Sequence, residues 1–158
     1  TSTRSIPFTR EAVRKEIPAM FAHALKLRQV SAGGDASVEM ELNATGNVNF
    51  DFGRYGVEFV ASPRHADGVA VTGPVSRNMA EALQVCYDAV PDPKVLIVAG
   101  SEAVSGGLYA ESTEVDRSFY ERHTPDLWLP GAPTHPMIFI EAVMNLIGRD
   151  RREDHTQK

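Results

Sequence analysis

The sequence predicts an α/β fold in which helices cover both faces of a small, mostly parallel sheet. Two Val-rich runs, 57–61 and 68–72, are too short for typical helices. Their continuous apolar character is typical of parallel strands that are covered on both sides. A third run, Val95–Ala99, has the same character, and segments with helical periodicity separate the runs. We therefore expect a three-layer arrangement with right-handed crossovers between strands.

The first 26 residues are predicted to form a helical extension, for which Thr9 is a candidate N-cap. Its apolar stripe follows helical spacing and consists of Val13, Ile17, Met20, Ala24 and Leu27. Pro18 interrupts the stripe, so either one kinked helix or two short helices are expected. The stripe either covers the sheet or docks a partner, and core packing is the commoner use of such a stripe.

The α/β domain is expected over residues 27–148 and begins with a strand, a glycine turn and a helix. The strand covers Leu27–Ser31, the turn 32–37 and the helix Val38–Ala44, and a connecting loop follows over 45–52. A glycine turn before a helix is the arrangement that binds phosphate in some folds. Neither GKS nor GKT nor a complete glycine fingerprint is present, which disfavours a phosphate loop.

A polar turn with Arg64, His65 and Asp67 separates the two Val-rich strands. Pro63 stops the first strand and biases Ser62 toward an extended conformation. The turn lies beside a strand end, where open α/β sheets usually carry functional groups. In a simpler interpretation Arg64 and Asp67 pair and cap the turn.

The second half of the domain is predicted to contain two helices and two strands. Ser76 is a candidate N-cap for a helix over 77–89, whose apolar face includes Cys86 as a small buried side chain. Strand 95–99, a long surface excursion over 108–126 and a short strand over 127–129 follow. A final helix ends at Gly148, and the charged tail 149–158 is expected to be disordered.

Composition excludes several classes of protein. A chain of 158 residues with one cysteine has no internal disulfide, and the net charge of −5 argues against a nucleic-acid binder. No apolar run reaches 18 residues and no signal-peptide core is present, so no membrane span and a cytoplasmic location are expected. His23, His123 and His155 lack metal-ligand spacing, and no G-x-S-x-G elbow appears.

Several motifs occur in the same order as in a known family. They are FVASPRHAD (59–67), VTGPV (71–75), RNMAEAL (77–83), VPDPK (90–94), SGG (105–107) and PGAP (130–133). The chain thereby resembles the 20 kDa-type small subunit of respiratory complex I and, more closely, the small subunit of formate-hydrogenlyase-type nickel–iron hydrogenases. The resemblance covers roughly residues 28–148 and implies a three-layer, flavodoxin-like fold.

In the resembled family, loops at the carboxyl edge of the sheet bind a 4Fe–4S cluster through four cysteines. The corresponding loops here are 32–38, 100–107 and 130–135. Aligned on the shared glycines and prolines, the four ligand positions fall on Asp35, Val38, Glu102 and Ala132. Because such a cluster needs about four thiolates, we expect that this chain alone cannot hold one.

Three functions remain open from the sequence. In the first, the chain has lost its cluster and is a structural or assembly subunit of a hydrogenase-like or NADH:quinone-oxidoreductase-like complex. In the second, it is an electron-transfer subunit with an unusually ligated cluster. In the third, it is a separate flavodoxin-like module that binds a nucleotide or flavin at the carboxyl-edge loops.

The degenerate site also contains candidate ligands for a divalent metal. Asp35 and Glu102 supply carboxylates, which repel one another unless they are protonated, paired or bound to a cation, and His135 supplies a nitrogen. The alternative is that these loop side chains are only solvated.

The resemblance also implies a large catalytic subunit as the partner. Arg64, His65 and Asp67 would then be interface or quinone-side residues, and the chain would lie at the inner face of the membrane through its partners. In isolation the surface that faces the partner would be left apolar, so a homo-oligomer is expected.

Overall fold

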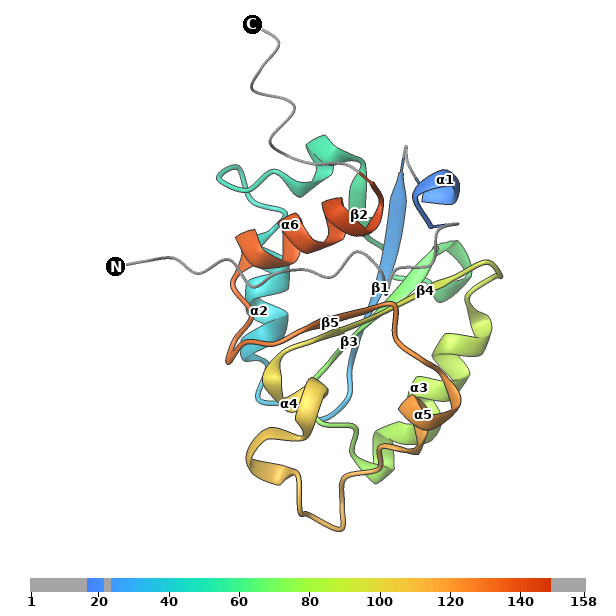
Figure 1. Cartoon of the computed structure of the whole chain (residues 1–158), viewed down its shortest axis with the longest axis vertical. Helices are drawn as coiled ribbons and strands as arrows, with labels where there is room; N and C mark the ends of the chain where they lie inside the picture. The colour runs from blue at the N-terminus through green and yellow to red at the C-terminus, as the bar shows by residue number, and fades with distance from the viewer. Residues whose placement is uncertain (1–16, 22–23, 149–158) are drawn as a thin grey trace, which may run out of the picture.

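The computed structural model describes residues 17–21 and 24–148, and its centre is a parallel sheet (Figure 1). In the described part of the chain the sheet has five strands in the order β2-β1-β3-β4-β5, and every neighbouring pair is parallel. The expected mostly parallel sheet is therefore confirmed. The strands are β1 (Leu25–Ser31), β2 (Val57–Phe59), β3 (Gly68–Thr72), β4 (Val95–Ala99) and β5 (Leu127–Leu129).

Helices cover both faces of this sheet, as the apolar runs predict. The α-helices are α1 (Ile17–Phe21), α2 (Ser37–Ala44), α3 (Arg77–Ala89), α4 (Ser101–Ser105), α5 (Ser118–Arg122) and α6 (Pro136–Leu146). Short 3₁₀ turns are η2 (Phe52–Tyr55), η3 (Pro63–His65) and η4 (Gly107–Tyr109). One core cluster joins α1, α2, η2 and α6 to the sheet, and the other joins α3 and α5 to its opposite face. The three layers are confirmed.

The strand order places the reversal of the chain between β1 and β3. From β1 the chain moves outward to β2 and then returns past β1 to β3. This order is that of flavodoxin-like sheets, in which ligands bind beside the carboxyl ends of the two strands at the reversal point. For this chain the point lies between Ser31 and Thr72, which are paired in register.

The amino-terminal prediction is only partly within the described residues. Thr9 and Val13 lie outside them, as does the tail 149–158. In α1, Ile17 of the stripe is buried in the same core cluster as α6. Phe21, which the predicted stripe does not include, is buried there too, whereas Met20 and Ala24 of the stripe are exposed, so the stripe covers the sheet only in part. Leu27 lies inside β1 rather than in a helix, because β1 begins at Leu25, two residues before the predicted start.

The long surface excursion predicted over 108–126 is correct for its first part and wrong for its second. Residues 107–114 are exposed, but α5 follows and buries Phe119 completely. The ring of Phe119 packs edge-on against Tyr87 of α3, with the centroids 5.4 Å apart. Apolar periodicity is weak in a five-residue helix that buries a single aromatic ring, which explains why the sequence pattern does not reveal it.

Cys86 is half-buried on α3 beside the second core cluster. Burial raises the pKa of its thiol, while the nearby Arg28 guanidinium acts in the opposite direction. A raised pKa disfavours the thiolate, so the predicted role as a small packing side chain fits better than a reactive one.

Phe119→Ala is expected to destabilise the protein by about 3–5 kcal/mol, because it removes the ring that holds α5 on the sheet. Urea unfolding followed by circular dichroism measures the change. The matched control is Tyr109→Ala, since Tyr109 is 51% exposed and its loss should cost less than about 0.5 kcal/mol. Equal losses for the two variants would contradict this account of α5.

Candidate functional site

The three predicted loops do converge at the carboxyl edge of the sheet. The Ser101 N–H donates to the Gly131 carbonyl at 2.7 Å, and the Gly131 N–H donates to the Ser101 hydroxyl at 3.1 Å. The loop that follows β1 lies against Gly73, which follows β3. This fourth loop, after β3, was missing from the sequence-based prediction.

Backbone packing at the reversal point leaves no room for side chains on two glycines. A Cβ atom added to Gly34 would lie 2.9 Å from the Gly73 Cα atom, and one added to Gly73 would lie 2.3 Å from the Gly34 nitrogen. Gly73 also has a φ of 73°, a conformation that favours glycine. The loops after β1 and β3 are therefore in direct backbone contact.

Glu39 joins the two strands at this point. Its Oε1 atom accepts a hydrogen bond from the Ser31 hydroxyl at the end of β1 and another, of 2.8 Å, from the Thr72 hydroxyl at the end of β3. Thr72 is completely buried. Sequence reasoning missed Glu39, although it directly follows Val38 and its position on α2 could have been compared with the ends of the strands.

The four predicted ligand positions have different environments. Asp35 is exposed, and its carboxylate accepts the Ser37 N–H at 2.9 Å. Val38 is buried on α2, where its side chain lies against Gly100. Glu102 is half-buried on α4, and Ala132 is exposed in the turn before α6. Of the four positions, only Asp35 and Glu102 thus place polar side chains at the carboxyl edge.

The pKa values of the Asp35 and Glu102 carboxyl groups shift in opposite directions. Hydrogen bonds from the Ser37 side chain and N–H lower the pKa of Asp35. Burial raises the pKa of Glu102, and the neighbouring carboxylates of Asp35 and Glu39 add to the increase. These three acidic groups therefore lie close enough to repel one another.

The predicted metal ligands are not assembled into one set. Across residues 17–21 and 24–148, no group of three or more His, Cys, Asp or Glu side chains is arranged to hold a metal ion. His135 instead caps α6, where its Nδ1 atom accepts the Met137 N–H at 3.2 Å, and its ring lies edge-on to Phe50. Metal binding by Asp35 and Glu102 stays a prediction, because in this arrangement His135 does not join them as a third ligand.

The turn with Arg64, His65 and Asp67 lies at the opposite, amino edge of the sheet. The reason is strand register: β2 pairs only with Leu25–Leu27, and Leu27 is also level with the first residue of β3. The end of β2 is therefore level with the start of β3. The turn therefore lies beside a strand end, as expected, but this end of β2 is at the amino edge and away from the three converging loops.

The simpler interpretation, in which Arg64 and Asp67 pair and cap the turn, does not match the contacts of either residue. The Asp67 carboxylate accepts the Lys26 N–H at 2.8 Å and so ties the turn to β1. No ion pair joins Arg64 to Asp67 within the described ranges, and both Arg64 and His65 are exposed.

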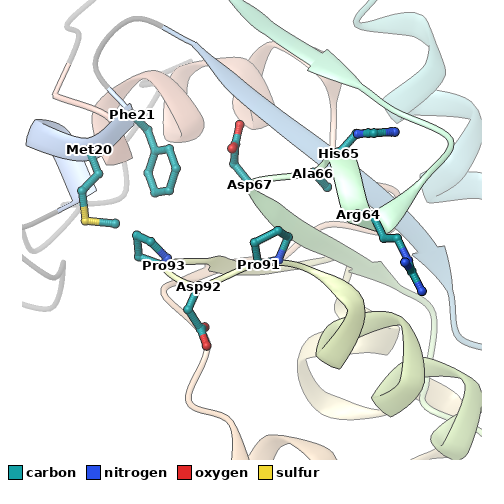
Figure 2. Close-up of a pocket in the computed structure, with 9 residues that line it drawn as sticks. All are labelled: Met20, Phe21, Arg64, His65, Ala66, Asp67, Pro91, Asp92 and Pro93. Atoms are coloured by element: carbon teal, nitrogen blue, oxygen red, sulfur yellow. The ribbon is translucent and has the colours of Figure 1, made fainter.

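A pocket of about 370 Å³ opens at this amino edge (Figure 2). Its apolar lining comes from α1, the turn before β3 and the segment before β4, and consists of Met20, Phe21, Ala66, Pro91 and Pro93. Its charged lining consists of Arg64, His65, Asp67 and Asp92. Figure 2 shows Phe21 and Met20 on one side of the pocket and Arg64 and His65 on the other.

The fold and the arrangement of its loops define a flavodoxin-like α/β protein with its candidate site at the carboxyl edge of the sheet. A family model described as "NADH ubiquinone oxidoreductase, 20 Kd subunit" matches residues 36–146. The chain belongs to this family. The resemblance to the 20 kDa subunit family, inferred from the sequence motifs, is therefore confirmed.

Two relatives, each named as the B subunit of an NADH-quinone oxidoreductase, support this assignment. The protein from Geotalea daltonii is 34% identical over 121 residues, which are 75% of this chain and 71% of the relative. The protein from Desulfovibrio desulfuricans is 36% identical over 113 residues, which are 72% of this chain and 61% of the relative. The chain thus spans less than two thirds of the second relative.

Solved structures show the same fold. One is a chain of the membrane-bound sulfane sulfur reductase, described as an archaeal respiratory membrane complex, with a TM-score of 0.66 and 24% identity; the match covers 83% of this chain and 70% of that one. Another is a chain of an NAD⁺-reducing [NiFe]-hydrogenase, with a TM-score of 0.58 and 19% identity; the match covers 80% of this chain and 93% of that one. The predicted flavodoxin-like fold is confirmed.

Glu102→Gln is expected to stabilise the protein at neutral pH, because it removes a negative charge that burial and two other carboxylates disfavour. Because the folded-state pKa of Glu102 is raised, the destabilisation of the folded protein by the Glu102 charge is absent below the ordinary glutamate pKa of 4.5. This destabilisation develops as the pH rises from that value through the folded-state pKa. The gain should be less than about 1 kcal/mol, because Glu102 is partly solvated.

Urea unfolding of wild type and Glu102→Gln near pH 7 and near pH 4 measures this difference. Glu81→Gln, an exposed site on α3, controls for the loss of one charge. A gain that is as large at the lower pH as at the higher one would refute the carboxylate repulsion.

Proposed function

We propose that this chain is a cluster-free subunit of an oxidoreductase complex of the NADH:quinone oxidoreductase or hydrogenase type, with a structural or assembly role. The family assignment supplies the class of complex. We infer the loss of the cluster, and with it the structural or assembly role, from the residues at the carboxyl edge. The large catalytic subunit of such a complex is the proposed partner.

The observation that carries the proposal is the donor set at the aligned ligand positions. Asp35, Val38, Glu102 and Ala132 supply two carboxylates and two apolar side chains in place of four thiolates. Cys86 is the one cysteine in the sequence, and it lies on α3 beside the second core cluster, away from the loops at the carboxyl edge. These residues do not fit a 4Fe–4S cluster.

Packing at the same edge supports this proposal. Val38 fills the space beside Gly100, where an added Cβ would lie 2.7 Å from the Val38 side chain. Glu102 lies against Gly107, and Gly34 lies against Gly73. Close packing of protein atoms stabilises the loops without an inorganic group between them.

Docking onto a larger partner is supported by the relatives and by the surface. The chains with the same fold come from a respiratory membrane complex and a hydrogenase. Apolar side chains at or near the carboxyl edge are exposed although they contribute nothing to the core; they are Met40, Leu108, Tyr109 and Ile138. Exposed apolar side chains that gather near one edge are typical of a surface that a partner covers.

Arg64, His65 and Asp67 are proposed as a second interface, at the amino edge. Arg64 and His65 are exposed and available to a partner, whereas Asp67 holds the turn to β1. No helix in the described residues is long and apolar enough to span a membrane. We propose that the protein is cytoplasmic and reaches the inner face of the membrane through its partners.

Anaerobically purified protein is expected to contain neither iron nor acid-labile sulfide, because no thiolate set is present. Metal analysis by mass spectrometry together with a sulfide assay measures this. Four irons and four sulfides per chain would refute the proposal in favour of the electron-transfer alternative. One tightly bound divalent ion that is lost in Asp35→Ala and Glu102→Ala would instead identify a metal site.

A further inference from the structure

We propose that α5 is an acid-sensitive clamp: when His123 takes up a proton, α5 loosens from α3 and releases α4, which it holds at the carboxyl edge. The clamp consists of α5 with Arg117 at its start and His123 at its end. In Figure 1 it lies beside α3, and its core cluster is on the face of the sheet opposite α6. The inference concerns the folded chain itself and does not depend on the proposed function.

His123 forms the contact between the end of α5 and α3. Its ring centroid lies 4.5 Å from that of Tyr87 in α3 and 4.8 Å from that of Phe119 in α5. Its Nε2 atom is 3.1 Å from the side-chain oxygen of Gln84 in α3. The orientation of the Gln84 amide is fixed, because its nitrogen donates to the Asp88 carboxylate at 2.9 Å. Since an amide oxygen only accepts, Nε2 of His123 carries a hydrogen, and Nδ1 is the atom that takes up the proton.

The surroundings of the His123 ring disfavour a positive charge on it. Partial burial lowers the pKa of His123, and the charges of Arg122 and Lys94 add to the decrease, whereas the Asp88 carboxylate opposes it. The Lys94 ammonium reaches this site from the segment before β4 and lies 4.4 Å from the Tyr87 ring centroid. A cation in the last turn usually stabilises a helix, but in α5 Arg122 already supplies that charge. Protonation of His123 therefore weakens the contact between α5 and α3.

Few contacts hold α5 in place, so it can open without unfolding the sheet. It has five residues, of which only Phe119 is fully buried. Tyr120 is partly buried, and its hydroxyl oxygen is shielded from water but has no hydrogen-bond partner among the described residues. A polar group in that state costs free energy, which is regained when water reaches it. Such a segment is typical of the parts of a protein that open locally.

Arg117 connects the clamp to the carboxyl edge. Its guanidinium donates to the Val104 carbonyl at 2.6 Å and to the Ala103 carbonyl at 3.5 Å, both in α4. The same guanidinium lies 5.4 Å from the ring centroid of Tyr120 in α5. Helix α4 also contains Glu102, one of the two carboxylates of the candidate site. Loosening of α5 therefore weakens a contact that holds this side of the candidate site in place.

The sign of the pH dependence follows from the direction of the pKa shift. Because the pKa of docked His123 is lowered, the contribution of its neutral ring to docking is complete above the ordinary histidine pKa of 6.5. This contribution decreases as the pH falls from that value through the docked-state pKa. The fraction of molecules with α5 open should therefore rise by about 2- to 5-fold between pH values near 7.5 and near 5.5.

Hydrogen exchange of the backbone amides near pH 7.5 and near pH 5.5 tests the proposal, with each rate corrected for the intrinsic exchange rate at that pH. The Tyr120 and His123 amides are hydrogen-bonded in α5, and their protection should be at least about tenfold lower than that of β4 at both pH values. Their protection should also decrease by about 2- to 5-fold at the lower pH. The protection of the Val104 amide in α4 should decrease with it.

Two variants of His123 and two others separate the steps. His123→Gln removes the titrating group and His123→Phe retains an aromatic ring in its place, and both should abolish the pH response. His65→Gln is the matched control, because His65 is an exposed histidine in η3, and it should keep the response. Arg117→Gln should keep the response of α5 and abolish that of α4. Circular dichroism shows which variants are folded.

Four results would each overturn the proposal. The first is protection of α5 as high as that of β4, which would mean that α5 does not open by itself. The second is protection of α5 that does not change with pH. The third is the wild-type response in a folded variant of His123, and the fourth is a response of α4 that persists in Arg117→Gln.

Discussion

The contact between the ends of β1 and β3 is the constraint on which the candidate site depends. Glu39 accepts hydrogen bonds from Ser31 and Thr72, and the backbones of Gly34 and Gly73 touch in the loops that follow these strands. In flavodoxin-like sheets this is the point where loops separate and ligands bind. Here the Glu39 side chain joins the ends of the two strands, and the glycines of the loops that follow lie against one another.

The other features of the carboxyl edge lie beside this contact between the ends of β1 and β3. Glu102 lies near Asp35 and Glu39, which together with burial raises its pKa. Val38 points into the core against Gly100 rather than toward a ligand. The edge therefore combines a packed interior with acidic and apolar groups on the surface. Such an edge fits the proposed structural role, and the fold shared with redox enzymes does not by itself imply their activity.

Much of this arrangement could be predicted from the sequence, because buried parallel strands carry a strong local signal. The Val-rich runs give β3 and β4, and the convergence of three loops follows from parallel strands. The register between strands has no such local signal in the sequence. The pairing of β2 with the start of β1 depends on tertiary contacts, and this pairing puts Arg64 at the amino edge. The roles of Glu39 and Phe119 were missed for the same reason, since each rests on partners from distant parts of the chain.

The most direct test of the central claim is a cryo-electron microscopy map of the complex assembled by this chain in its native host. The cluster-free account predicts density at the carboxyl edge for the Glu39 carboxylate between Ser31 and Thr72, and none for metal. Strong cuboidal density bonded to Asp35 and Glu102 would contradict it. That result would show that the edge opens in the complex and that carboxylates have replaced thiolates as ligands.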